Sequence, residues 1–309
     1  MNDRAAVRPI TVSIAAVERD TGLSKDTLRV WERRYGFPMP VRDAYGERAY
    51  PLDQVEKLRV IKRLLDNGHR PGRVVAMSVE ELQSIGESLA AAPQRFTTSG
   101  NTDLREYIAA IKAHDVQGLR RQLGHAMMRL GVGRFVCDVV APLNVMVGDA
   151  WMRGQIEVFE EHMYTESVNT VLRHAISTAP VPSALASPRV LLTTFPQEPH
   201  GLGLLMAEVM LALEGANCIS LGTQTPIWDI VLAATAHRAC IVALSFTASQ
   251  NPNYVSNGLE ELRSKLPANI EIWAGGGCPI IYRKSIEGVY AIADLQSIRE
   301  TMSRWRNHH

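Results

Sequence analysis

The sequence predicts a multidomain chain: an α-helical helix-turn-helix module, a four-helix bundle, and an α/β domain with a flavodoxin-like (Rossmann-like) sheet. Three observations support this order. Residues 13–35 hold two short helical patterns separated by Gly22, residues 102–180 hold four longer ones, and residues 188–309 alternate apolar strands with helices. A chain of 309 residues is long enough for two or three domains.

Charge is distributed unevenly along the chain. The net charge is +1, yet residues 1–75 hold 15 Lys and Arg against 10 Asp and Glu, giving +5, which leaves −4 for the remainder. A basic amino-terminal module on a mildly acidic body indicates that only this module meets a polyanion. The hydrophobic content of 46% with 21% charged residues is typical of soluble globular proteins.

The cysteines predict neither a disulfide framework nor a zinc site. They form no Cys-x-x-Cys pair and lie scattered in apolar surroundings: Cys137, Cys218, Cys240 and Cys278. Residues 1–9 are charged and lack a signal-peptide core, and no apolar run approaches the length of a membrane span. We therefore expect a cytoplasmic protein without membrane contact.

The first module has the punctuation of a helix-turn-helix. Gly22 marks the tight turn, and Ser24 is a favourable N-cap for a helix over residues 25–35. Leu28 and Trp31 are expected to face the core of the module, and the second helix to enter the major groove. The candidate DNA contacts are then Lys25, Thr27, Arg29, Arg33 and Arg34. The alternative is an ordinary surface helix with salt bridges through Asp26 and Glu32.

The continuation favours DNA binding. Residues 27–36, followed by residues 42–50 and 55–68, resemble the winged-helix DNA-binding domain of the MerR family, with the resemblance covering residues 11 to about 76. It implies that Arg42, Arg48 and Tyr50 of the wing touch the phosphate backbone, and that a dimer binds pseudo-palindromic double-stranded operator DNA. Residues 77–101 indicate a linker without the long pairing helix of MerR dimers, so the oligomer contact is expected elsewhere.

Residues 102–182 are predicted to form an up-and-down four-helix bundle. The helical patterns cover residues 102–114, 116–130, 132–153 and 157–178, and the connections between them are short. In the next domain, residues 188–309, apolar strands are expected at 190–194, 217–221, 239–245, 270–274 and 289–291. Right-handed crossovers bring the loops that follow the first, third and fourth strands to one edge of the sheet, where α/β folds bind ligands.

The loop after the first of these strands carries Glu198-x-His200-x-x-Gly203. The carboxylate of Glu198 is close enough in sequence to orient the His200 imidazole and to raise its basicity behind a metal ion. Gly201 and Gly203 permit close approach of a bulky planar ligand. Taken alone, a solvated loop histidine beside a glutamate is the more common arrangement.

Two further elements downstream favour the ligand. Together with Ser245-Phe246-Thr247 and Gly275-Gly276-Gly277, this loop resembles the three-part cobalamin-binding signature of methionine synthase and the base-off mutases. Glu198 stands where that signature has Asp, and Thr247 where it has Leu. The resemblance implies that His200 is the lower ligand of the cobalt and that Gly203, Ser245, Thr247 and Gly275 to Gly277 line the cofactor site.

A third motif lies in the bundle. Trp151, followed after nine residues by Glu161-His162, resembles the Trp-x9-Glu-His motif of the CarH and LitR family, which are MerR-type photoreceptors with a carboxyl-terminal cobalamin domain. The resemblance implies that Trp151, Glu161 and His162 surround the 5′-deoxyadenosyl group. Met152 follows the motif Trp where some family members carry a histidine that ligates cobalt after photolysis. A thioether is a poorer cobalt ligand than imidazole.

The family resemblance implies a non-enzymatic, light-responsive repressor with adenosylcobalamin, a cobalt corrinoid, as cofactor. Such a protein binds its operator in the dark as a tetramer and is released on photolysis. Two alternatives stay open. One is a corrinoid methyl carrier or mutase subunit, which has no use for a DNA-binding module. The other is a regulator that senses a different corrinoid state, redox or another tetrapyrrole, which Met152 keeps in consideration.

Overall fold

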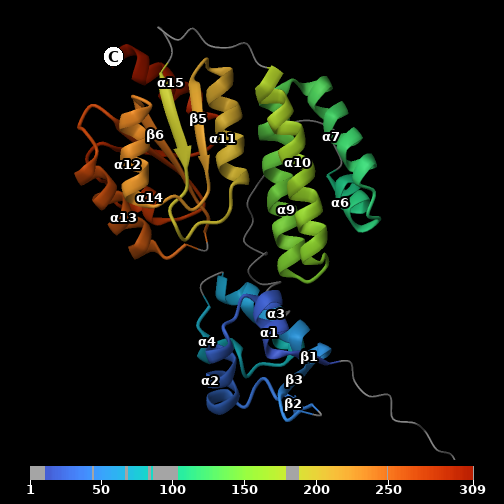
Figure 1. Cartoon of the computed structure of the whole chain (residues 1–309). Coiled ribbons are helices and arrows are strands. Elements are labelled where there is room, and N and C mark those ends of the chain that lie inside the picture. Colours follow the sequence, from blue (N-terminus) through green and yellow to red (C-terminus); the bar gives the residue numbers. More distant parts are fainter. Residues whose placement is uncertain are drawn as a thin grey trace, which may run out of the picture. The chain divides into compact units, whose positions relative to one another are not determined.

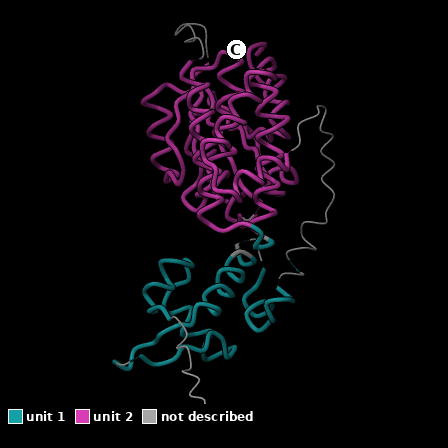
Figure 2. The backbone as a smooth tube through the Cα atoms, turned by 90° about the vertical axis from the view of Figure 1, so that its right-hand side faces the viewer, with its two compact units in different colours: residues 1–94, 152–155 teal, residues 95–151, 156–309 magenta. Residues whose placement is uncertain are grey.

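The computed structural model describes most of the chain, namely residues 11–43, 45–66, 69–82, 85, 104–178, 188–248 and 250–308. The chain divides into two compact units, one of residues 1–94 with 152–155 and one of residues 95–151 with 156–309 (Figure 2). Within the described part of the chain, no helix combines the length and the apolar character needed to span a bilayer.

The amino-terminal unit contains helices packed on a small antiparallel sheet of order β1-β3-β2. Its elements are β1 (Thr11–Ser13), α1 (Ile14–Thr21), α2 (Lys25–Tyr35), β2 (Val41–Arg42), β3 (Arg48–Pro51), α3 (Leu52–Asp66) and α4 (Pro71–Val74). The side chains of Ser13 and Ser24 cap α1 and α2, and Gly22 ends α1 in the left-handed conformation that glycine adopts without strain. The predicted helix-turn-helix is therefore present, with Leu28 and Trp31 in its core.

Part of the predicted linker is ordered. Residues 79–82 are helical, and Ser78 and Glu81 exchange hydrogen bonds, because each side chain accepts the backbone N–H of the other. Residues 86–101 of the predicted linker lie outside the described residues.

The second unit begins with a helical region. It contains α6 (Arg105–Lys112), α7 (Val116–Leu130), α8 (Val132–Phe135), the π-helix η1 (Val136–Val140), α9 (Ala141–Met152) and α10 (Val158–Thr178). The pattern predicted as one helix over residues 132–153 is thus interrupted by a π-helical turn, a feature that the apolar periodicity does not reveal. The core of this region also includes Leu202, Leu205, Met206 and Val209, which belong to the α/β region that follows.

The α/β region has five parallel strands in the order β5-β4-β6-β7-β8 (Figure 1). The strands are β4 (Arg189–Thr193), β5 (Asn217–Gly222), β6 (Ile241–Phe246), β7 (Glu271–Gly276) and β8 (Val289–Ile292). The helices are α11 (Leu202–Leu213), α12 (Ile227–Ala236), α13 (Pro252–Lys265), α14 (Ile280–Arg283) and α15 (Ser297–His308). Helices α11 and α15 pack together on one face of the sheet, and α12, α13 and α14 pack on the other.

This strand order confirms the predicted parallel, Rossmann-like sheet. The chain leaves β4 toward β5 on one side and later returns to place β6 on the other, so the strand order reverses between β4 and β6. Loops at such a point diverge and leave a crevice at the carboxyl edge. Residues 194–201 and the segment that begins at Thr247 lie at this edge.

Candidate functional site

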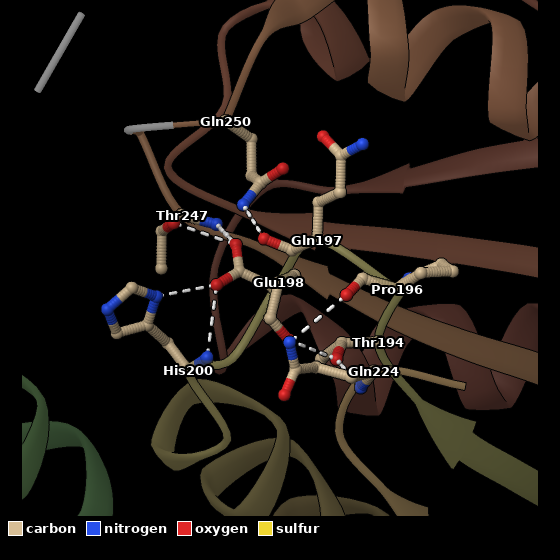
Figure 3. Close-up of polar contacts among 8 residues, drawn as sticks. All are labelled: Thr194, Pro196, Gln197, Glu198, His200, Gln224, Thr247 and Gln250. Carbon is tan, nitrogen blue, oxygen red and sulfur yellow. Dashed lines mark hydrogen bonds and ion pairs between the residues drawn. The ribbon is translucent and has the colours of Figure 1, made fainter. Parts of the chain in front are cut away.

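The carboxylate of Glu198 organises the loop after β4. It is fully buried, and its two oxygens accept four hydrogen bonds (Figure 3). Oε1 accepts the His200 ring nitrogen Nδ1 at 2.6 Å and the His200 amide at 3.1 Å. Oε2 accepts both the amide and the hydroxyl of Thr247 at 2.7 Å. The loop after β4 and the loop after β6 are therefore joined through one carboxylate.

These hydrogen bonds determine the charge of Glu198. Burial alone raises the pKa of a carboxyl group, but the donors from His200 and Thr247 more than offset burial and lower the pKa of Glu198 below its usual value. The carboxylate is therefore ionised at neutral pH, and it fixes a proton on Nδ1 of His200. The His200 side chain is 62% exposed, with Nε2 as the ring nitrogen that Glu198 does not engage.

Other contacts hold the loop in this shape. The hydroxyl of Thr194 donates to the carbonyl of Glu198 at 2.6 Å, and Gln250 Nε2 donates to the carbonyl of Gln197 at 2.8 Å (Figure 3). The ring of Phe195 is buried edge-on against Phe246, with 5.1 Å between centroids. The imidazole thus stands on a loop tied to strands and neighbouring loops, which suits a metal ligand that must keep one orientation.

The predicted glycines line the approach to this loop. A Cβ on Gly203 would lie 3.0 Å from the hydroxyl of Ser245, and one on Gly276, where φ is 109°, would lie 2.2 Å from the carbonyl oxygen of Phe246. A Cβ on Gly277 would lie 3.1 Å from the amide nitrogen of Ala248. Only glycine keeps these backbone segments in close contact.

A cavity of about 710 Å³ opens beside these glycines, between α11 and the sheet. Gly203, Ser245, Gly275 and Gly276 line it, together with apolar side chains from α11, β6, β7 and α15. Of the residues predicted to hold the cofactor, these four share the cavity, whereas Glu198, His200 and Thr247 form the adjoining network. The volume is in the range of small-molecule and cofactor sites.

The bundle motif lies at the junction of α9 and α10. Trp151 is partly buried against the core of the helical region, one residue before α9 ends. In the first turn of α10, Glu161 accepts the hydroxyl of Thr165 at 2.8 Å, and its other oxygen lies 2.8 Å from Nδ1 of His162. His162 is 71% exposed and Glu161 32% exposed. The side chain of Met152 lies outside the described part of the structure.

Two residues that carry no distinctive signal in the sequence, Glu160 and His114, fix this first turn. Glu160 is buried; its Oε2 accepts the amide of Glu157 at 2.6 Å, and its Oε1 lies 3.0 Å from Nε2 of His114. His114 comes from the turn between α6 and α7, and its ring also contacts that of Phe159. In the sequence, Glu160 cannot be distinguished from its acidic neighbour Glu161. Its partner His114 is 46 residues away in the chain, so no local pattern reveals the pair.

The predicted DNA contacts lie on α2 and on the β2–β3 hairpin, but they differ in whether their side chains already have partners within the protein. Lys25 pairs with Glu18 at 3.5 Å, Arg29 with Asp26 at 3.1 Å, and Thr27 contributes to the Ser24 cap. Arg34 lies over the ring of Tyr35. Arg33 is exposed, and no ion pair involves it within the described residues.

The hairpin residues also differ. Arg42 is exposed and donates to the carbonyl of Gly46, whereas Arg48 forms a half-buried pair with Glu32 of α2 at 2.8 Å. Tyr50 is fully buried in the core of the unit, and burial is the main cause that raises the pKa of its phenol. Tyr50 is therefore a core residue in this structure, contrary to the expectation that it touches the phosphate backbone.

Comparison with protein families gives each region a counterpart. Residues 12–77 match the MerR HTH family regulatory protein. Residues 103–176 and residues 188–297 each match a B12 binding domain. The residues present are compatible with these matches, because the oriented imidazole of His200 can ligate a metal ion and the glycines border a cavity of about 710 Å³.

The chain is also similar to two complete regulators. It is 30% identical to the HTH-type transcriptional repressor CarH of Myxococcus xanthus over 273 residues, which is 88% of this chain and 90% of CarH. The chain belongs to the CarH family. The family assignment extends to the HTH-type transcriptional repressor CarA of the same organism, which is 27% identical over 96% of both chains. Both comparisons confirm the predicted CarH-like combination of a MerR region with B12-binding domains.

One solved structure has a similar fold over part of the chain. The monomethylamine corrinoid protein of Methanosarcina barkeri superposes with a TM-score of 0.50 and 16% identity, over 63% of this chain and 94% of its own. At this identity the likeness concerns the fold alone.

Proposed function

We propose that this chain is a light-responsive repressor that binds operator DNA as an adenosylcobalamin-bound oligomer and releases the DNA on illumination. The observation that carries the proposal is the Thr247–Glu198–His200 network, which prepares one exposed imidazole at the switch point of a B12-binding domain. A MerR region in the same chain gives that site a regulatory output.

In this proposal His200 would ligate the cobalt through the ring nitrogen that Glu198 does not engage. Ionised Glu198 keeps the proton on Nδ1 and raises the basicity of the ring, and Thr247 keeps Glu198 in place. Gly203, Ser245, Gly275 and Gly276 would hold the nucleotide tail along the cavity, and Gly277 keeps the adjoining backbone close to Ala248. When bound, the adenosyl form supplies a cobalt–carbon bond that light cleaves.

Residues 102–182 act as a four-helix-bundle cap that senses the upper ligand. Trp151 would pack on the adenosyl group, where an aromatic contact contributes about 1 kcal/mol beyond burial. Glu161 and His162 lie in a turn fixed by Glu160 and His114, so that they meet the ligand without rearranging. Because a ligand shifts an assembly only by binding one state better, loss of these contacts is what favours dissociation.

Residues 1–76 act as the winged, DNA-reading domain, and the β2–β3 hairpin is its wing. We assign the base contact of α2 to Arg33, because Lys25 and Arg29 have carboxylate partners and Arg34 lies over the ring of Tyr35. Arg42 meets phosphate from the hairpin. Residues 77–101 link this domain to the cap.

The direct test mixes dark, adenosylcobalamin-loaded protein with operator DNA and then illuminates it. We expect the complex to be large and DNA-bound in the dark, and to fall in mass and release the DNA after illumination. Size-exclusion chromatography with light scattering and a gel-shift assay measure the two changes. An unchanged mass together with unchanged DNA binding would rule out photoregulation.

Met152 is the residue that supports a second candidate stimulus, namely the identity of the corrinoid upper ligand. Met152 stands where some relatives carry a cobalt-ligating histidine, so a corrinoid with a different upper ligand is the alternative signal. Absorption spectra of the protein with methyl-, hydroxo- and adenosylcobalamin, before and after light, separate the two. An operator affinity that follows the upper ligand in darkness and ignores light would favour corrinoid sensing.

A further inference from the structure

Strand β8 (Val289–Ile292) forms one edge of the five-stranded sheet, and in the part of the chain that the structure describes it pairs with β7 alone. In a parallel pair, alternate residues of a strand form their hydrogen bonds with the same neighbour. The amide of Ile272 in β7 donates to the carbonyl of Gly288, so Gly288 and every second residue after it face β7. The backbone groups of Val289 and Ala291 therefore point away from the sheet.

Most of these outward groups have no partner within the protein. The amide of Val289 donates to the carbonyl of Ile286 at 3.1 Å. Among the described residues, no hydrogen bond engages the carbonyl of Val289 or the amide and carbonyl of Ala291, which is exposed. An unpaired strand edge of this kind is a template for another chain, to which it offers here one donor and two acceptors.

This edge lies in a groove with two walls. A cavity of about 420 Å³ is lined by residues 289–291 of β8, by α15 on one side, and by α13, α14 and the turn after α14 on the other. The hydroxyl of Tyr282 in α14 contacts the carbonyl of Gly276 at 2.8 Å and that of Ile292 at 3.0 Å. These contacts fix the carboxyl end of β8 and leave the outward groups before it open to the groove.

The groove has cationic walls. Among the described residues that line it are Arg283, Lys284 and Arg304, whereas no Asp or Glu lines it. Arg304 pairs with Glu271 at 2.7 Å, and Lys284 pairs with Glu260 at 2.5 Å. Arg283 is exposed, and none of the described carboxylates pairs with it. Arg283 is thus the cation of the groove that can meet a carboxylate of a bound molecule.

The groove favours one kind of occupant over two others. A second copy of this chain, paired edge to edge across a two-fold axis, would bring the same cations together, and like charges oppose association. A simple anion would have no N–H donors for the carbonyls of Val289 and Ala291. An extended peptide supplies donors and acceptors along one edge, and its acidic side chains complement Arg283.

We infer that β8 accepts an extended, acidic segment of a partner protein as an added strand, with a carboxylate of that segment on Arg283. Main-chain hydrogen bonds to Val289 and Ala291 hold the segment, and the cationic walls select its charge. This interaction requires neither the cofactor nor DNA. It gives the α/β region a protein-binding surface in addition to the site at the carboxyl edge of the sheet.

The first experiment measures binding of two dye-labelled octapeptides, (Asp-Val)4 and (Lys-Val)4, to the full-length protein by fluorescence anisotropy. We expect the acidic peptide to bind at least about tenfold more tightly than the basic one. Arg283→Glu should weaken binding of the acidic peptide at least about fivefold. Arg238→Glu makes the same change of charge at an exposed position outside the groove and should leave binding unaltered. Undetectable binding of (Asp-Val)4, equal binding of the two peptides, or unchanged binding in Arg283→Glu would each overturn the inference.

The second experiment tests strand addition without altering the protein. In an added strand, alternate peptide amides face β8 and the others face away from it. We therefore compare (Asp-Val)4 with one derivative N-methylated at every Asp and another N-methylated at every Val. One derivative should lose at least about tenfold in affinity, and the other should bind like the parent peptide. Equal affinities of the two derivatives would show that the peptide does not pair with the strand edge, and would overturn the inference.

Discussion

Replacing Thr247 with Val removes one donor from a buried carboxylate that accepts four, and it leaves the side-chain shape nearly unchanged. The Thr247 amide still donates to Glu198, so only the hydroxyl contact at 2.7 Å is lost. A hydrogen bond to a charged group is worth about 1.5–3 kcal/mol, and changes behind a metal ligand typically cost about 10- to 100-fold in metal affinity. The two estimates agree, because 1.4 kcal/mol corresponds to a factor of about ten.

We therefore expect Thr247→Val to weaken cobalamin binding by about 10- to 100-fold near neutral pH, measured by titration followed in the visible spectrum. Thr247→Ser retains the hydroxyl and should stay close to the unmodified protein. The difference should shrink in acid. Hydrogen bonds lower the pKa of Glu198, so their contribution is present above its unfolded pKa of about 4.3 and is lost as pH falls through the folded value. Unchanged affinity in Thr247→Val would refute the idea that this hydroxyl supports the lower ligand.

Three other predictions concern separate parts of the chain. Burial raises the pKa of Glu208 more than its partner Arg173 lowers it, so the stabilising contribution of protonated Glu208 is present at low pH and is lost as pH rises. Glu208→Gln should therefore raise the melting temperature at mildly alkaline pH by roughly 2–4 °C, which is the effect of about 1 kcal/mol on a domain of this size. A lower melting temperature in the variant would contradict this prediction. Arg33→Ala should weaken operator binding, measured by gel shift, by about 10- to 100-fold without altering the spectrum of bound cobalamin. The control Arg121→Ala on α7 should change neither operator binding nor the spectrum. If Arg33→Ala gave the same gel shift as the unmodified protein, Arg33 would be excluded as a base contact. Burial raises the pKa of Cys218 to about 12 and that of Cys137 to about 11. Iodoacetamide should therefore modify both thiols slowly in the folded protein at neutral pH and rapidly in urea, as measured by mass spectrometry. Fast modification of the folded protein would show that the two thiols are accessible to solvent.

The sequence was most informative for the strands of the parallel sheet, because both faces of that sheet are buried. Buried parallel strands consist of continuous apolar residues, so the five strands of the sheet were found with boundaries within two residues of β4 to β8. The carboxyl-edge loops followed from the strands, since parallel strands end at the same edge. His200 and Gly203 could be selected because they stand in such a loop.

Other features depend on contacts between distant residues and leave no local pattern. The π-helical turn at Val136–Val140 lies in a stretch that is as apolar as an α-helix would be. Tyr50 lies two residues after Arg48 in β3 and is fully buried, whereas Arg48 is half-buried in a pair with Glu32, and the local sequence does not reveal this difference. The two departures from the cobalamin signature appeared independent in the sequence, but Glu198 and Thr247 are in fact hydrogen-bonded to each other across 49 residues.

In the proposed function, the imidazole of His200 would be the protein's ligand to cobalt. The most direct measurement compares visible spectra of the unmodified protein and His200→Ala, each reconstituted with adenosylcobalamin in the dark and desalted. We predict that the unmodified protein retains the corrinoid with the spectrum of an imidazole-ligated, base-off form, and that the variant loses that spectrum. Identical spectra for the two proteins, or a colourless unmodified protein after desalting, would contradict the account.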